Sequence, residues 1–343
     1  MSNAAQTLDT DAVAAYLSET LPGFEGPIEA KKFEGGQSNP TFLLKTPAKN
    51  YVLRRKPPGA LLKSAHAVDR EFRVQSALAG SDVPVAKMHV LCDDDAVIGS
   101  MFYIMDHVAG RNFNDPTMQG EDNATRGAVV DDMNRVLAAL HMVDIDAVGL
   151  GDYGPPGNYF ERQVARWSKQ YKASETTQIP AMDQLMSALV ERRPEDDGQR
   201  TLVHGDYRID NMIFSSTGTN CLAVLDWELS TTGHPYADLA SVIMQWQLPP
   251  GKEGRGLAGL DRADLGLPTD EEFIARYCER RGLDGIDDFG YYLSFCFFRM
   301  AGIIQGVLKR ALDGNASNPE RAMKVGAFVP VFAQHGLDAL ERR

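Results

Sequence analysis

The sequence has few cysteines, and they form no metal-binding pattern. None of the four belongs to a CxxC or CxxH pair: Cys92, Cys221, Cys278 and Cys296. This spacing argues against a zinc ribbon, an iron–sulfur centre and a disulfide framework. The 343 residues are 43% hydrophobic and 24% charged, so a core can form without such cross-links. We expect reduced, buried or half-buried thiols in a cytoplasmic protein.

The chain also lacks a surplus of positive charge and an uninterrupted apolar segment. Its net charge is −12, whereas nucleic-acid phosphates require a basic face, so we expect no nucleic-acid partner. The first 21 residues carry acidic side chains and no basic segment ahead of an apolar run, unlike a secretory signal. The richest late apolar run, residues 291–308, is interrupted by Arg299 and Gln305, so we expect no membrane span.

Hydrophobic periodicity divides the chain near residues 106–111. Before this point the pattern predicts helices at 9–21 and 65–79 and strands at 28–33, 41–45, 51–55, 85–92 and 102–107. After it, helical patterns cover 123–144, 159–173, 181–193, 236–247, 270–282, 288–312 and 318–340, with a β-rich island at 201–226. The glycine-rich segment 249–268 predicts a surface loop or lid. We expect an N-terminal domain of residues 1–106 and a C-terminal domain of residues 107–343.

The sharpest chemical pattern is HGDYRIDN at residues 204–211, followed by DWE at residues 226–228. Phosphoryl transfer from ATP needs a carboxylate for the acceptor hydroxyl, oxygen ligands for Mg²⁺ and a cation beside the phosphoryl group. Asp206 supplies the carboxylate and Arg208 the cation. Asn211 and Asp226 supply two oxygen ligands, and a hairpin between them would bring both to one edge. The pattern therefore predicts phosphoryl transfer.

These motifs resemble the aminoglycoside phosphotransferase and choline kinase branch of the protein-kinase-like fold. HxDxRxxN followed by D-W-E is similar to the kinase catalytic loop and its metal-binding motif. GGQSN resembles the phosphate-covering turn, YVLRR the third strand and FYIMDHVAG the strand and hinge that hold adenine. The resemblance covers residues 28–340. It implies an α+β, two-lobe fold with a small antiparallel β-sheet lobe and a larger, mainly helical lobe.

The resemblance also implies a role for individual residues. Arg54 would bridge the nucleotide phosphates and be held by Glu71, although lysine is usual at the position of Arg54. Asp238 would bond the backbone of the catalytic loop, and His204 would be structural. The resemblance gives the remaining catalytic and metal roles to Asp206 as base, Arg208 at the γ-phosphate, and Asn211 and Asp226 at Mg²⁺. The nucleotide-binding positions would be Gly36, Gln37, Ser38, Met105, Asp106, His107 and Val108. We expect His141 to be a packed histidine.

Segments such as DREFRVQSAL and LDWELSTTGHPYADLA are similar to phosphotransferase domains found alone in bacteria and fused to acyl-CoA dehydrogenases in animals. In this acidic chain, a local set of basic residues indicates an anionic acceptor. The alternative is that they only form a solvated helix face and loop. The residues are Arg162, Arg166, Lys169, Lys172, Lys252, Arg255 and Arg262. We predict an Mg-ATP-dependent phosphotransferase acting on a hydroxyl of a hydroxyacyl-CoA or hydroxy acid. The alternatives are a non-catalytic pseudokinase-type binding module and an aminoglycoside- or choline-type kinase.

Overall fold

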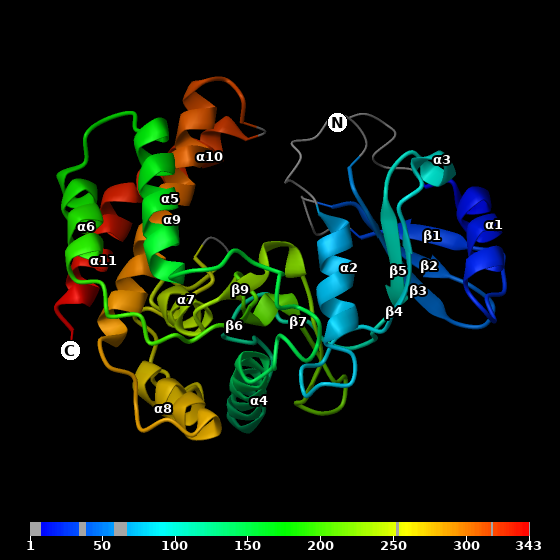
Figure 1. The fold of residues 1–343 in the computed structure, drawn as a ribbon. Helices are drawn as coiled ribbons and strands as arrows, with labels where there is room; N and C mark the ends of the chain where they lie inside the picture. Colours follow the sequence, from blue (N-terminus) through cyan, green and yellow to red (C-terminus); the bar gives the residue numbers. More distant parts are fainter. Residues whose placement is uncertain (1–7, 34–38, 58–66, 252–253, 317, 343) are drawn as a thin grey trace. The chain divides into compact units, whose positions relative to one another are not determined.

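The computed structural model describes residues 8–33, 39–57, 67–251, 254–316 and 318–342 (Figure 1). The chain forms two compact units. The first contains Met1–Phe113, Ile145–Leu150 and Arg208–Ser230, and the second contains Asn114–Asp144, Gly151–Tyr207 and Thr231–Arg343. This division differs from the expected single boundary at 106/107, because later segments join the N-terminal part. Arg111 and Phe214, for example, exchange backbone hydrogen bonds of 2.7 and 2.8 Å.

The first unit is built on a five-stranded antiparallel sheet of order β1-β2-β3-β5-β4. Its strands are β1 (Glu29–Lys32), β2 (Thr41–Lys45), β3 (Asn50–Arg55), β4 (Met88–Cys92) and β5 (Phe102–Asp106). All five lie within, or one residue beyond, the predicted ranges. This confirms the small antiparallel lobe.

Side-chain alternation gives the sheet two distinct faces. Leu53 and Ile104 pack with Leu17 of helix α1 (Thr10–Thr20) in one apolar cluster. The neighbouring residues Arg54 and Tyr103 point to the opposite face, where both contact Glu71 of helix α2 (Val68–Ala77). Leu53 and the residues packed with it form the apolar core on one face of the sheet. Arg54, the next residue in the strand, therefore lies on the other face, beside α2.

Two short segments complete the first unit. The predicted hairpin is present as β7 (Met212–Phe214) paired antiparallel with β8 (Cys221–Val224). The acidic segment 93–95 leads into a short helix, α3 (Asp95–Ile98). Asp94 caps this helix by accepting a 2.8 Å hydrogen bond from the Ala96 N–H.

The second unit is mainly helical. Its helices are α4 (Asn123–His141), α5 (Tyr159–Ser174), α6 (Pro180–Glu191), α7 (Tyr236–Trp246), α8 (Asp270–Arg281), α9 (Phe289–Leu312), α10 (Pro319–Gly326) and α11 (Val329–Leu340). The strands β6 (Thr201–Val203) and β9 (Thr231–Gly233) form an antiparallel pair. Helix α9 contacts α5, α6, α7, α10 and α11, so it forms the centre of this unit (Figure 1).

The apolar helix α9 is a core helix by its burial. All residues from Tyr291 to Phe298 are buried. Within the described chain, α9 alone is long and apolar enough to cross a membrane on length and composition, but 67% of the relevant window is buried inside the protein. Such burial is typical of the core helix of a globular domain.

Two expectations for the C-terminal half differ from the structure. The helix expected over 318–340 is two helices, because Pro330 lacks an N–H and its ring would clash with the carbonyl of Gly326 in a continuous helix. The expected surface loop at 249–268 buries Leu257 and Leu267, and Leu257 N–H donates to Trp246 O at 2.8 Å. The described part of this loop is therefore anchored to α7.

Gly290 allows the end of α11 to approach the first turn of α9. A Cβ at Gly290 would lie 2.3 Å from Ala339 O and 2.7 Å from Arg342 O. Replacing glycine by alanine inside a helix normally stabilises it by about 1 kcal/mol. We expect Gly290→Ala to destabilise the protein instead, because the clash involves backbone atoms, and to lower its Tm in thermal unfolding.

The matched control is Gly306→Ala in the same helix. The nearest atom to a Cβ there is the flexible Arg310 Nη1, at 3.7 Å. This variant should keep or slightly raise the Tm. Equal effects of the two substitutions would contradict the assigned close approach.

Candidate active site

The loop that carries Asp206 is fixed through its backbone in the second unit. Strand β6 ends directly before His204, and Gly205 has a φ of 84°, in the left-handed region that favours glycine. Buried Asp238, in the first turn of α7, accepts hydrogen bonds from His204 N–H at 2.6 Å and Gly205 N–H at 2.9 Å. The structure therefore contains the backbone contacts expected of Asp238.

His204 acts on the same loop from inside. Its ring is fully buried, and its Nδ1 accepts a 3.2 Å hydrogen bond from the Asp206 N–H. The next residue, Tyr207, is also buried, and its hydroxyl donates to Met133 O at 2.7 Å. These contacts fit a structural role for His204 and leave the half-buried Asp206 at a fixed point of the chain.

Arg299 also contacts this loop, although the sequence did not predict a role for it. Its Nη2 donates to Gly205 O at 2.5 Å. Arg299 therefore binds a carbonyl oxygen of the loop, whereas Asp238 accepts from two of its N–H groups. The only sequence signal was an arginine inside the apolar run of α9. A charge in such a run requires a polar partner once it is buried, and the catalytic-loop backbone provides one.

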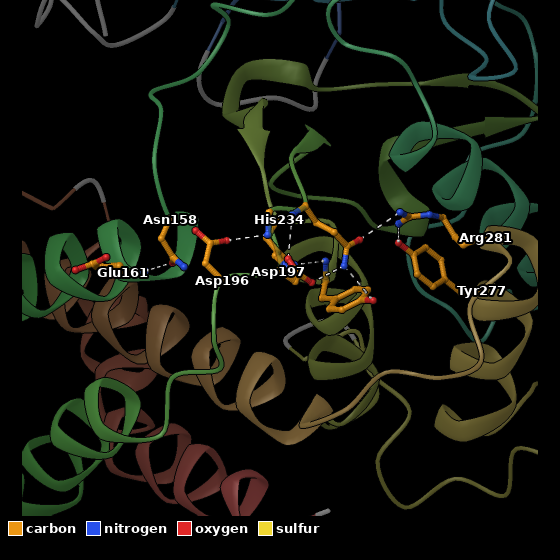
Figure 2. Close-up of polar contacts among 10 residues, drawn as sticks. Asn158, Glu161, Asp196, Asp197, His234, Tyr277 and Arg281 are labelled. Atoms are coloured by element: carbon orange, nitrogen blue, oxygen red, sulfur yellow. Dashed lines mark hydrogen bonds and ion pairs between the residues drawn. The ribbon is translucent and has the colours of Figure 1, made fainter.

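A buried chain of polar groups supports Asp238 from behind. His141 Nε2 lies 3.5 Å from Asp238 Oδ2, and His141 Nδ1 lies 2.7 Å from the Tyr277 hydroxyl. Arg281 Nη1 donates to the same hydroxyl at 2.6 Å (Figure 2). Because Asp238 is an acceptor on the Nε2 side, a neutral His141 carries its proton on Nε2, and its Nδ1 accepts from the Tyr277 hydroxyl.

Burial and these partners set the charges of the chain. Burial lowers the pKa of His141, with Asp238 opposing the shift, so the neutral imidazole is favoured. Burial would raise the pKa of Asp238, but its hydrogen bonds with His141 and the Gly205 N–H outweigh this effect and hold that pKa below its usual range. Asp238 is therefore an ionised carboxylate inside the protein.

A second histidine–carboxylate pair lies in the same unit. Asp197 Oδ1 is 3.2 Å from His234 Nε2 (Figure 2), and the His234 ring stacks on Tyr292 with 5.4 Å between centroids. Burial lowers the pKa of His234 although Asp197 opposes this shift. Both buried histidines therefore favour the neutral form.

In the first unit, Arg54 is surrounded by three carboxylates. Its Nε lies 2.9 Å from Glu71 Oε2, and its Nη2 lies 2.8 Å from Asp226 Oδ1 and 3.5 Å from Glu228 Oε2. The expected pairing of Arg54 with Glu71 is therefore present. The planar guanidinium reaches two sides at once, which a lysine ammonium does less well.

Glu71 has two further partners besides Arg54. Asn39 Nδ2 donates to its Oε1 at 2.8 Å, and the Tyr103 hydroxyl donates to its Oε2 at 3.1 Å. Burial raises the pKa of Glu71 to about 7, against the opposing effect of Arg54. For Arg54, burial is outweighed by the surrounding acidic groups, so its pKa lies above the usual value. The cluster thus carries more acidic groups than one arginine neutralises.

The predicted metal ligands lie at one end of the β7–β8 hairpin. Asn211 O accepts a 2.8 Å hydrogen bond from the N–H of Leu225, the residue before Asp226. Asp226 has a φ of 62°, an uncommon backbone conformation for a residue other than glycine and one typical of functional sites. Arg208 Nε donates to Asp210 Oδ1 at 2.5 Å. The metal and γ-phosphate roles of these residues remain predictions.

The remaining predicted nucleotide positions divide into two groups. Gly36, Gln37 and Ser38 lie outside the described residues. The second group lies at and just after the end of strand β5 and consists of Met105, Asp106, His107 and Val108. Within it, the Asp106 carboxylate lies 2.8 Å from Lys49 Nζ and 2.7 Å from His89 Nε2. Their contact with adenine stays a prediction.

Within the described residues, the structure brings some predicted groups together and separates others. Arg54, Glu71, Arg208, Asn211 and Asp226 belong to the first unit, whereas Asp206, His204 and Asp238 belong to the second. No group of three or more His, Cys, Asp or Glu side chains there is arranged to hold a metal ion. The predicted ligand pair combines one carboxylate with one amide.

The comparison with known families identifies this arrangement. The profile of the phosphotransferase enzyme family matches residues 29–286, about three quarters of the sequence. The chain belongs to the phosphotransferase enzyme family. The predicted family and the α+β, protein-kinase-like fold are thereby confirmed.

Two relatives of this chain in the mouse are longer proteins. It is 44% identical to Mus musculus acyl-CoA dehydrogenase family member 10, covering 90% of this chain and 29% of that protein. It is 42% identical to family member 11 of the same species, covering 97% of this chain and 43% of that protein. The chain therefore spans less than half the length of these two relatives.

Solved structures support the same fold. A Ralstonia eutropha protein, provisionally called an aminoglycoside phosphotransferase, is 48% identical with a TM-score of 0.90, covering 98% of this chain and 99% of that one. A thermostable mutant of aminoglycoside phosphotransferase APH(4)-Ia, in a ternary complex with AMP-PNP and hygromycin B, is 17% identical with a TM-score of 0.61, covering 97% and 100%. Choline kinase from Cryptosporidium parvum is 12% identical with a TM-score of 0.63, covering 96% and 97%. At these last two identities the likeness concerns the fold alone.

The two buried histidines make the stability of the protein sensitive to acid. In the unfolded chain each histidine titrates near ~6.5, above its lowered folded pKa, so the unfolded state binds more protons as pH falls. The stability that the neutral His141 and His234 contribute is therefore fully present above about pH 6.5 and is lost progressively in the window below that pH. We expect the Tm to fall less over this window for His141→Gln than for the unaltered protein.

The comparison between the two proteins isolates this effect. Glu71, with its raised pKa, contributes with the opposite sign over the same pH window, but its contribution is common to both. Differential scanning calorimetry in steps across the window measures the difference. Parallel Tm curves would contradict the neutral assignment of His141.

Proposed function

We propose that this phosphotransferase transfers the γ-phosphoryl group of ATP to a hydroxyl of a small anionic acceptor, a hydroxyacyl-CoA or a hydroxy acid. The observation that carries the proposal is the position of Asp206. It directly follows a backbone held by Asp238 on its N–H side and by Arg299 on its carbonyl side. A half-buried carboxylate on so fixed a loop suits a reaction that depends mainly on positioning.

In the proposed step, Asp206 accepts the proton of the acceptor hydroxyl. The acceptor oxygen forms a bond to the γ-phosphorus, the bond between that phosphorus and the β,γ-bridging oxygen breaks, and ADP leaves. Arg208 steadies the charge on the transferred group and Arg54 binds the remaining phosphates. The fold neighbour with bound AMP-PNP supports ATP as donor.

The acidic surplus around Arg54 supports a divalent cation at the nucleotide. Glu71, Asp226 and Glu228 all face this one guanidinium, and carboxylate oxygens suit Mg²⁺. Asp226 and Asn211 would hold the ion, which when bound would neutralise phosphate charge. Arg54 would then exchange its contact with Asp226 for nucleotide phosphate.

The proposal of an anionic acceptor is supported by only part of the predicted set of basic residues. Lys172 Nζ lies 2.6 Å from Asp183 and Arg262 Nη1 lies 2.6 Å from Asp270, so both are occupied by internal ion pairs. Lys252 lies outside the described residues. Arg162, Arg166 and Lys169 of α5 and Arg255 of the loop after α7 remain candidates. The names of the mouse relatives add support for an acyl-CoA link.

Mass spectrometry of a transfer panel tests the reaction. Protein with Mg-ATP is offered hydroxyacyl-CoAs, hydroxy acids, choline and aminoglycosides. We expect a product heavier by one phosphoryl group from an acyl acceptor, and none from Asp206→Asn, because an amide cannot accept the proton. The loss should be roughly a hundredfold or more, the usual scale for a general base.

The same panel separates the alternatives. Phosphorylated choline or aminoglycoside would overturn the anionic acceptor and retain the kinase. If no acceptor reacted and calorimetry detected no binding of Mg-ATP, the phosphotransferase proposal would fail in favour of a non-catalytic binding module.

Calorimetry of ATP binding tests the cation site. Removing Mg²⁺ with EDTA should weaken ATP binding to the unaltered protein, because phosphate then faces unneutralised carboxylates. Asp226→Asn should reduce the effect of Mg²⁺ by about tenfold or more, equivalent to at least ~1.4 kcal/mol. Glu29→Gln, an exposed carboxylate paired with Lys45 in the same unit, is the charge-matched control and should behave as the unaltered protein. An unchanged response to Mg²⁺ in Asp226→Asn would remove Asp226 from the cation site.

A further inference from the structure

Two arginines from neighbouring helices lie at the same level beside the catalytic loop. Helices α5 and α9 are in contact side by side (Figure 1). The Phe160 and Phe295 rings lie 5.2 Å apart between centroids, and a Cβ on Gly302 would lie 3.4 Å from Trp167 Cε3. The second contact lies seven residues after the first on both helices, at Trp167 after Phe160 and at Gly302 after Phe295. The two helices therefore run in the same direction. Arg162 and Arg299 each fall between these two contacts.

Tyr159 gives a second indication that these arginines are neighbours. Its ring packs so closely on Gly233 that a Cβ there would lie 2.6 Å from two ring atoms. Burial raises the pKa of the Tyr159 hydroxyl to about 12, and the charges of Arg299 and Arg162 both oppose this shift. The two guanidiniums therefore act on the same hydroxyl from α9 and α5.

These two arginines differ from other basic residues of the second unit. Lys172, Arg262 and Arg280 each pair with a carboxylate at 2.6 to 2.8 Å. Among the described residues, neither Arg162 nor Arg299 forms an ion pair with a carboxylate. Arg162 Nη2 reaches only Gly157 O at 3.5 Å, and its buried Nε has no hydrogen-bond partner in the described part of the chain. A buried donor without an acceptor is costly, so a ligand oxygen is its natural partner.

We propose that Arg162 and Arg299 form the subsite for the acyl oxygens of the acceptor, an inference that rests on the proposed function and assigns its acceptor end. The bound group is a carboxylate or the carbonyl oxygen of a thioester. Arg299 donates to Gly205 O, one residue before Asp206, so the anchored oxygen lies only a few bonds from the reacting hydroxyl. The phosphates of CoA lie beyond the whole pantetheine arm and are too remote to be this group.

The anchor predicts positional selectivity. Arg162 and Arg299 project from two packed helices, and Asp206 follows a fixed backbone, so all three hold a set spacing within one unit. An acyl chain tied at its carbonyl then presents one carbon position to Asp206. The phosphotransferase should prefer one hydroxyl position within a series of otherwise identical acceptors.

Binding without turnover provides the first test. The probes are 3-, 4- and 5-hydroxyhexanoate and their CoA thioesters, titrated calorimetrically in the absence of ATP. We expect Arg162→Met to weaken binding of the preferred isomer by about tenfold or more, since a charge-assisted bond is lost. Arg162→Lys should retain part of the affinity. Arg192→Met, which removes an exposed arginine paired with Glu341, should bind as the unaltered protein, and Mg-ATP affinity should be the same in all variants.

Kinetics on the same series provides the second test. Arg162→Met should raise the KM for the acceptor more than it lowers kcat, and should flatten the preference among the three positions. Equal losses for acids and thioesters assign the contact to the shared carbonyl oxygen, whereas a loss confined to acids assigns it to the carboxylate.

Other outcomes overturn the subsite or the reaction separately. An equal weakening by Arg166→Met would replace the subsite with a diffuse effect of charge, and so overturn it. Absence of acyl binding to the unaltered protein would also overturn it. Binding that depends on Arg162 without any transfer would refute the proposed reaction and keep the subsite; transfer that is indifferent to Arg162→Met would do the reverse.

Discussion

The ionised carboxylate of Asp238 is the constraint on which the catalytic loop depends. A buried charge is stable only when hydrogen-bond donors surround it. Asp238 obtains them from His204 N–H, Gly205 N–H and His141, so the path of the chain into Asp206 is set by the need to satisfy this carboxylate. The left-handed φ of Gly205 follows from the same requirement, because the loop must turn while presenting two consecutive N–H groups to one side chain.

The first unit treats buried charge in the opposite way. Around Asp238 the donors match the acceptor, whereas around Arg54 three carboxylates face one guanidinium. A matched cluster holds a backbone in place, and an unmatched cluster favours the arrival of positive charge. Arginine suits this second setting better than the usual lysine, because two of its nitrogens, Nε and Nη2, contact Glu71 and Asp226 simultaneously.

Local patterns predicted much of this molecule, and long-range contacts account for what they missed. Alternating residues gave the five strands, and the spacing of HGDYRIDN and DWE gave the family and the hairpin at Asn211. Strand β9 is only three residues long, Thr231–Gly233, and exists because it pairs with β6, which no local pattern reveals. The contact of Arg299 with Gly205 and that of Tyr277 with His141 likewise join residues more than 90 positions apart.

The two aspartates on either side of this loop illustrate why burial is needed to assign roles. Asp206 and Asp238 both lie in conspicuous motifs, and the sequence presents each as a carboxylate near the start of a structural element. Asp238 is 1% exposed and bonded to backbone, whereas Asp206 is half-buried. A carboxylate enclosed by its own protein is unavailable to a substrate, so Asp206 rather than Asp238 is the residue to which we assign the proposed chemical role. The two residues have the same side chain, so only their different burial in the folded protein distinguishes the roles that we assign to them.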